Sequence, residues 1–116
     1  MTQPERPLIL LIGQDSTLEY LLNRYALESG HEVRSVRELS EQIDVHALRP
    51  VTVWFSSLDV LEAFAAVRVA VTSIDIPIVV CSSVVDDSRA SELGADYVFL
   101  HPITYDCFLS VLTGMG

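Results

Sequence analysis

Apolar residues gather in five short runs along the chain, separated by segments of mixed polarity. Residues 8–12, 51–55 and 77–82 are almost continuously apolar, which is typical of strands buried on both faces of a parallel sheet. Residues 32–36 are more polar and suit an edge strand, and residues 97–100 form a further short run. The pattern therefore predicts five strands.

Helical periodicity occupies the stretches between these runs, with apolar residues three or four positions apart. Asp15 or Ser16 can cap the first helix, and Gly30 ends it. Capping-box patterns begin at Ser35 and at Asp59, in front of the second and the third helix. Five helices are predicted, over residues 17–29, 35–47, 59–72, 86–93 and 105–112.

The regular alternation of strand and helix predicts an α/β domain whose parallel sheet carries helices on both faces. The 116 residues suit one domain, spanning residues 1–116, and show no internal repeat or linker. In such sheets, sites for ligands or reactions lie beyond the carboxyl ends of the strands. We therefore expect any chemistry near Ser56 and Ser57, which follow the central run 51–55.

Charge and composition exclude several classes of protein. The net charge is −9, and seven singly spread Lys and Arg residues do not form the basic face that a nucleic-acid binder needs. No apolar run approaches the roughly 20 residues that span a bilayer, and no signal-peptide pattern is present, so we expect a cytoplasmic protein without membrane contact. Cys81 and Cys107 fit reduced core residues, and the histidines lack metal-ligand spacing, so neither metal nor cofactor is expected.

Three segments carry a resemblance to a known family. Residues 94–102 (GADYVFLHP) are similar to the motif GAD-x-Y-x-x-K-P, residues 76–83 (IPIVVCSS) to P-I-I-x-L-T/S-A, and residues 49–56 (RPVTVWFS) to x-P-D-L-V-L-L-D. These motifs form the fifth, fourth and third strands of response-regulator receiver domains, the modules of two-component signalling. The resemblance covers about residues 8–112 and implies a flavodoxin-like, doubly wound (βα)5 fold with strand order 2-1-3-4-5.

The phosphorylation site of that family depends on a small set of residue types. An Asp at the end of the third strand accepts the phosphoryl group, and two acidic residues after the first strand bind Mg²⁺ with it. A Lys before the last Pro and a Thr or Ser after the fourth strand contact the phosphoryl oxygens. In this chain Ser56 stands at the position of the phosphoacceptor Asp, and Gly13 and Gln14 stand at those of the acidic pair. His101 replaces the Lys, and Ser82 keeps the hydroxyl after the fourth strand. The family also has an aromatic residue on the fifth strand that takes part in its conformational switch, and Val98 occupies that position.

These replacements predict a degenerate pocket. Without paired carboxylates nothing holds Mg²⁺ beside the phosphoryl charge, and a Ser hydroxyl needs a base to become a useful nucleophile. Asp15 lies one residue past the acidic pair, and Asp59 fits better as a helix cap. The resemblance therefore implies a phosphorylation-independent pseudo-receiver that is not an enzyme, binds no Mg²⁺ and acts through a protein partner in a signalling pathway.

Two alternatives stay open at this point. Ser56, Ser82 and His101 are expected to meet over the sheet, where Asp15 could complete a small Ser–His hydrolase site. We favour instead a pocket without catalytic activity, filled by these polar side chains and their hydrogen bonds, because no G-x-S-x-G turn supplies oxyanion donors. The other alternative is a divergent receiver that responds to another ligand or input.

Helix surfaces are where we expect the partner to dock. In the third predicted helix, Leu61, Ala65 and Val69 form a second apolar stripe beside the core-facing side. In the first helix, Tyr20 and Leu27 point away from the core side. The last helix leaves mainly polar side chains outside. We therefore expect a partner, or a second copy in a homodimer, to use the third helix more than the last.

Overall fold

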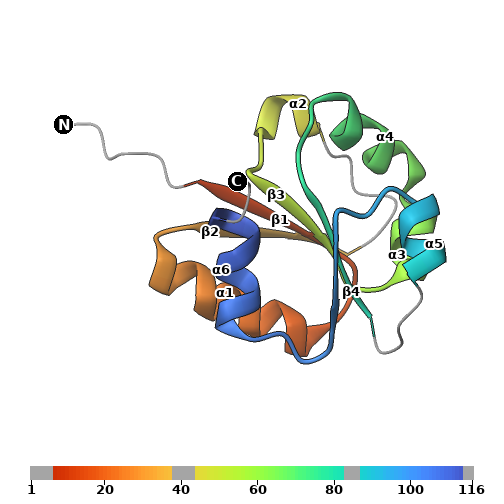
Figure 1. Ribbon diagram of the computed structural model, residues 1–116. Coiled ribbons are helices and arrows are strands. Elements are labelled where there is room, and N and C mark those ends of the chain that lie inside the picture. The colour runs from red at the N-terminus through yellow and green to blue at the C-terminus, as the bar shows by residue number, and fades with distance from the viewer. Residues whose placement is uncertain (1–6, 38–43, 83–86, 114–116) are drawn as a thin grey trace.

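Five parallel strands form the sheet at the centre of the molecule (Figure 1). The computed structural model describes residues 7–37, 44–82 and 87–113. The strand order is β2-β1-β3-β4-β5, which confirms the predicted fold class and topology. In chain order the elements are β1 (Leu8–Ile12), α1 (Ser16–Ser29), β2 (Glu32–Val36), α2 (Val45–Leu48), β3 (Thr52–Phe55), α3 (Leu58–Ala63), α4 (Ala65–Ser73), β4 (Ile78–Ser82), α5 (Asp87–Glu92), β5 (Tyr97–Leu100) and α6 (Tyr105–Thr113).

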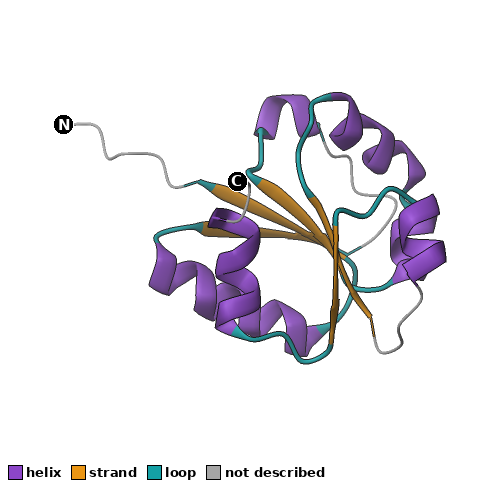
Figure 2. Cartoon of the chain, in the orientation of Figure 1, coloured by secondary structure: helices purple, strands orange, loops and turns teal. Residues whose placement is uncertain are grey.

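Helices cover both faces of this sheet (Figure 2). α1 and α6 lie on one face, and α2, α3, α4 and α5 lie on the other. Successive strand residues point to opposite faces, so Ile9 and Leu11 pack under α1 and α6 while Leu10 and Ile12 pack under the other layer. This two-sided burial explains why the central strands are apolar at almost every position. In the described residues, no helix is long and apolar enough to cross a membrane.

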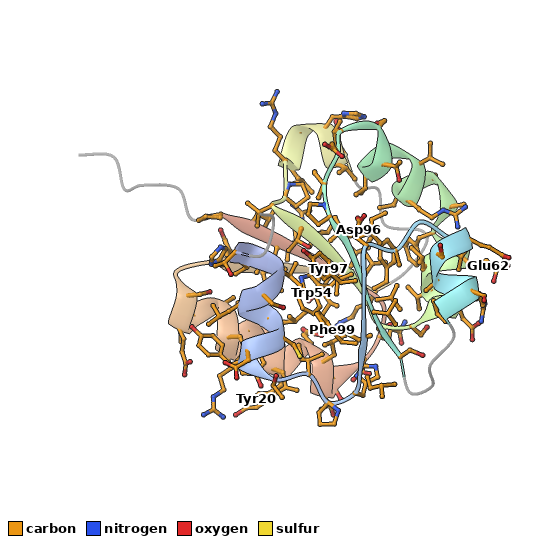
Figure 3. All side chains as sticks on the ribbon, in the orientation of Figure 1. Tyr20, Trp54, Glu62, Asp96, Tyr97 and Phe99 are labelled. Atoms are coloured by element: carbon orange, nitrogen blue, oxygen red, sulfur yellow. The ribbon has the colours of Figure 1, made fainter. Side chains whose placement is uncertain are left out.

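Trp54 lies at the centre of the layer that α1 and α6 form with the sheet (Figure 3). Its side chain is fully buried, and its ring centroid is 6.0 Å from that of Phe108 and 6.1 Å from that of Phe99. The prediction that Trp54 is a core residue is therefore confirmed. Trp54 is the one tryptophan of the chain, so its fluorescence can be used to follow the packing of this layer.

The third predicted helix is divided in the structure. α3 ends and α4 begins at Phe64, whose backbone leaves helical geometry at φ −95° and ψ 47°. In one continuous helix, Leu58 and Val71 would point about 140° apart, because successive residues turn by ~100°. The break lets both side chains face the core. Leu61 is fully buried because it lies one turn after Leu58 on the same side of α3, so the prediction that Leu61 belongs to an exposed stripe is wrong.

Two predicted helix caps differ from the observed ones. Ser57, not Asp59, caps α3, since Ser57 Oγ accepts a hydrogen bond from Val60 N at 3.1 Å. Ser35 lies inside β2, and the described helix that follows is α2, which Asp44 caps. Residues 38–43 of the predicted second helix lie outside the described residues. For α1, the predicted cap Asp15 and the stop at Gly30 are confirmed.

Candidate functional site

The carboxyl ends of four strands bring together the residues expected at the degenerate pocket. Gly13 follows β1, Ser56 follows β3, Ser82 ends β4 and His101 follows β5. Backbone hydrogen bonds fix their positions: Ser56 N donates to Ile12 O at 3.0 Å, and His101 N donates to Ser82 O at 3.1 Å. The predicted convergence of Ser56, Ser82 and His101 is therefore confirmed.

An open pocket of about 310 Å³ lies over these strand ends. Its polar lining is made of hydroxyls, two carboxylates, one guanidinium and one imidazole. The lining residues are Asp15, Ser56, Ser57, Leu58, Asp59, Ser82, Arg89 and His101. Gln14 lines a neighbouring hollow instead, where its side-chain amide donates to Arg37 O at 3.2 Å.

Gly13 and Ser56 pack so closely that residue 13 has no room for a side chain. A Cβ atom built on Gly13 would overlap Ser56 Oγ and lie 2.8 Å from Ser56 Cβ. The Gly13 backbone also has φ 125°, a conformation that residues with side chains rarely adopt. Its amide donates to Val36 O at 2.9 Å, which holds this turn against β2. The side chain of Ser56 therefore fills the space beside β1.

The His101 ring contacts the main chain of Ser56. Its Nε2 lies 3.3 Å from Ser56 O and 3.7 Å from Asp15 Oδ2, and the ring is partly buried. A Ser–His nucleophile instead requires the imidazole to accept the hydroxyl proton. Among the contacts of the described residues, the ring nitrogen meets the Ser56 carbonyl and not Ser56 Oγ. This arrangement fits a polar filling better than a hydrolase site.

Both carboxylates of the pocket already have partners. Asp15 Oδ1 accepts a hydrogen bond from Leu18 N at 3.0 Å, the N-cap contact of α1. Asp59, in the first turn of α3, is exposed and accepts from Arg89 Nη2 at 2.7 Å. Asp15 thus caps a helix, and Asp59 takes part in an ion pair.

Arg89 is a pocket residue that the sequence interpretation missed. It lies on α5, and its Nη2 donates to Asp59 at 2.7 Å and to Glu62 at 2.6 Å, which ties α5 to α3. Hydrogen bonds to Asp59 and Glu62 raise the pKa of the Arg89 guanidinium. Its sequence signal was weak, because Arg89 is a single basic residue in a short polar segment without a motif.

Cys81 lies on β4, beside the pocket but inside the core. It is fully buried, which confirms its prediction as a core residue. Burial, with smaller contributions from Asp15 and Cys107, raises the pKa of the Cys81 thiol to about 12. The thiol therefore stays protonated at neutral pH and is a poor nucleophile.

Solved structures of several bacterial signalling proteins are similar to this chain. No protein-family model matches the chain, and no curated protein matches it significantly. Chemotaxis protein CheY4 from Vibrio cholerae superposes with a TM-score of 0.75 at 15% identity, over 96% of this chain and 99% of that one. A response regulator from Burkholderia multivorans gives 0.69 at 22% identity, over 95% and 94% of the two chains. The chain has the receiver fold. An orphan response regulator of H. pylori shares it, with a TM-score of 0.69 at 19% identity over 96% of this chain and 98% of that one.

In the receiver fold, the resemblance places the switch aromatic at Val98 on β5. Val98 is half-buried and packs on the core layer that α3, α4 and α5 cover. The flanking Tyr97 and Phe99 belong to the opposite layer, where their ring centroids are 6.1 Å apart. Neither neighbouring ring therefore stands in for an aromatic residue at position 98.

Four of the five predicted interface residues are exposed. Tyr20 and Leu27 on α1 expose 62% and 71% of their surface, and Val69 on α4 exposes 63%. Ala65 is also exposed, one turn before Val69 on the same helix. Tyr20 points away from the body of the molecule (Figure 3). The candidate surface therefore keeps Ala65 and Val69 on α4, without the buried Leu61.

Proposed function

We propose that this chain is a phosphorylation-independent pseudo-receiver, a protein-interaction module of bacterial two-component-type signalling. The receiver fold supports a role in such signalling at a general level. The residues at its pocket support the finer proposal. Of the positions that the family uses for phosphoryl chemistry, only Ser82 keeps the expected residue type.

The packing of Gly13 against Ser56 carries this proposal. A carboxylate after β1 must start from a Cβ atom, and Ser56 Oγ occupies the place where that atom would lie. Gly13, at the position of the first acidic residue, thus packs against Ser56, at the position of the phosphoacceptor. The two positions form a packed, neutral pair in this chain.

The remaining donors do not fit Mg²⁺. This ion favours near-octahedral oxygen coordination that includes carboxylates. Asp15 Oδ1 caps α1 and Asp59 Oδ1 pairs with Arg89, so an ion at this pocket would compete with these contacts for the same carboxylates. Arg89 and His101 add basic groups to the same pocket, which further disfavours a divalent cation. We therefore propose no metal-dependent step for this chain.

The proposed activity is recognition and not catalysis. With His101 facing a carbonyl and Cys81 protonated, the pocket offers no activated nucleophile among the described residues. A partner would therefore bind the surface of the domain outside this pocket. The exposed apolar residues of α4, Ala65 and Val69, suit contact with a protein or with a second copy of the chain.

Incubation with a phosphodonor tests the proposal. The purified chain is treated with acetyl phosphate and Mg²⁺, and its intact mass is measured over time. We expect no gain of a phosphoryl group at a rate above that of the heat-unfolded chain. A stoichiometric gain that requires the folded chain and Mg²⁺ would overturn the proposal.

A further inference from the structure

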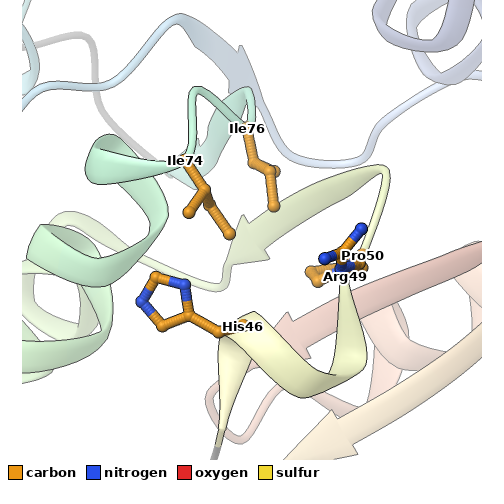
Figure 4. Close-up of a pocket in the computed structure, with 5 residues that line it drawn as sticks. All are labelled: His46, Arg49, Pro50, Ile74 and Ile76. Carbon is orange, nitrogen blue, oxygen red and sulfur yellow. The ribbon is translucent and has the colours of Figure 1, made fainter.

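A second pocket lies at the opposite end of the sheet from the phosphorylation-site positions (Figure 4). Its volume is about 410 Å³, within the range of small-molecule sites. One wall comes from the end of α2 and the turn into β3, and the other from the turn between α4 and β4. The lining residues are His46, Arg49, Pro50, Ile74 and Ile76.

The walls of this pocket differ in chemistry. Ile74 and Ile76 are half-buried and face the α2 side as an apolar wall, and Pro50 adds apolar surface opposite them. His46 and Arg49 supply the basic groups of the lining. Within the described part of the chain, neither side chain has an ion-pair or hydrogen-bond partner. Both basic side chains are exposed, and Figure 4 shows them apart, with His46 on the side of Ile74 and Arg49 beside Pro50.

Two residues beside this pocket have a backbone conformation that is uncommon outside glycine. The described non-glycine residues with positive φ are Arg49 at 48° and Asp75 at 60°. Arg49 ends α2, and Asp75 lies between Ile74 and Ile76, so both flank this pocket. Glycine adopts this conformation freely and Asp tolerates it, whereas a long side chain such as that of Arg49 is strained in it. Such strained positions cluster at ligand-binding sites and other functional sites.

We propose that this pocket binds a small organic anion with a single negative charge and an apolar body. The body lies against Ile74, Ile76 and Pro50, and the anionic group meets Arg49. A guanidinium suits a carboxylate because it can donate two parallel hydrogen bonds. The nearby negative charge of Asp75 disfavours more highly charged anions such as phosphate dianions. This inference goes beyond the proposed function and does not depend on it.

Octanoate is a suitable probe, with 1-octanol and octylamine as matched controls of the same chain length. Amide shifts of the ¹⁵N-labelled chain are followed by NMR during titration below the micellar concentration of each probe. Octanoate should give saturable shifts at the α2 end and around Ile74 and Ile76. Octylamine should give none, and octanol should bind at least about tenfold more weakly, as expected for loss of a charge-assisted hydrogen bond.

Two variants separate binding from folding. Arg49→Gly and Asp75→Gly each replace a residue of positive φ with the residue that adopts it freely, which offsets the larger entropy of Gly in the unfolded chain, so both should keep a stability close to that of the parent. Arg49→Gly should weaken octanoate binding at least about tenfold, whereas Asp75→Gly should keep or tighten it. The proposal is overturned if octanoate gives no saturable shifts, if octanol binds equally well, or if Arg49→Gly leaves the affinity unchanged.

Discussion

Ser56 Oγ occupies the space in which a side chain at Gly13 would begin. Two residues 43 positions apart are thereby coupled, because β1 and β3 are neighbours and Ser56 N donates to Ile12 O at 3.0 Å. In a receiver, the same two positions supply carboxylates to one cation. Here they form a close, uncharged contact, so changing either residue alone disturbs the other.

Gly13→Ala should destabilise the chain by about 2–4 kcal/mol, because the new methyl group meets Ser56 and the backbone keeps a positive φ. Gly30→Ala is the matched control. Gly30 also has a positive φ, but no atom lies within 4 Å of its built Cβ, so about 1 kcal/mol is expected. Urea unfolding followed by Trp54 fluorescence measures both values. Equal losses for the two variants would contradict the packing of Gly13 against Ser56.

Ser56→Asp alone should not restore phosphorylation. It adds a partly desolvated carboxylate beside β1 but supplies neither the acidic pair nor a Lys at position 101, and it should lower stability. The combined change Gly13→Asp, Gln14→Asp, Ser56→Asp and His101→Lys restores the chemical groups. It also adds a side chain at the strained position 13, so we expect it to fold less stably than the parent. Intact mass after acetyl phosphate treatment reads out phosphorylation, and a stable acyl phosphate on the single variant would refute this expectation.

Ala65→Glu with Val69→Lys should weaken association by more than about 1 kcal/mol, because both residues lie on the exposed apolar side of α4. Ser110→Glu with Thr113→Lys makes the same charge changes on exposed positions of α6. This control should leave association unaltered. Sedimentation or pull-down with a purified partner measures the effect, after circular dichroism has confirmed the fold. If the two double variants changed association equally, α4 would not be the binding surface.

Alkaline pH should destabilise the chain through Cys81. Its pKa is raised from 9.0 to about 12 in the folded state, mainly by burial. Between these values the unfolded chain releases a proton that the folded chain retains, so stability is fully present below about pH 9 and falls as pH rises. The slope should approach about 1.4 kcal/mol per pH unit for this one group. Cys81→Ala removes the titrating group, and an unchanged slope in that variant would show that other groups cause the loss.

The strands were predictable because local sequence decides them. β1, β3 and β4 are apolar at almost every position, and burial on both faces of a parallel sheet requires that pattern. The break at Phe64 was not predictable, since no Gly or Pro marks it. The break lets Leu58 and Val71 both reach the core, whereas Leu61 is buried because it lies one turn after Leu58 on the same side of α3.

The sequence was enough to predict where the pocket lies in the fold, but it predicted only some of the contacts between the pocket's side chains. Strand ends placed Ser56, Ser82 and His101 together without any knowledge of side-chain geometry. The fit of Gly13 against Ser56 depends on the distance between two strands, and the Arg89 ion pairs depend on the placement of α5. Such long-range contacts leave no periodic signal in the sequence.

An NMR titration of the folded chain with Mg²⁺ and beryllofluoride, an unreactive mimic of a phosphoryl group, tests directly whether the pocket still assembles a phosphoryl site. A pseudo-receiver should show no saturable amide shifts at Ser56, Ser82 or Val98, and the same spectrum with Mg²⁺ alone as without it. Saturable shifts at Ser56 and Ser82 that require both Mg²⁺ and beryllofluoride would instead show that the chain is a receiver with a working phosphorylation site.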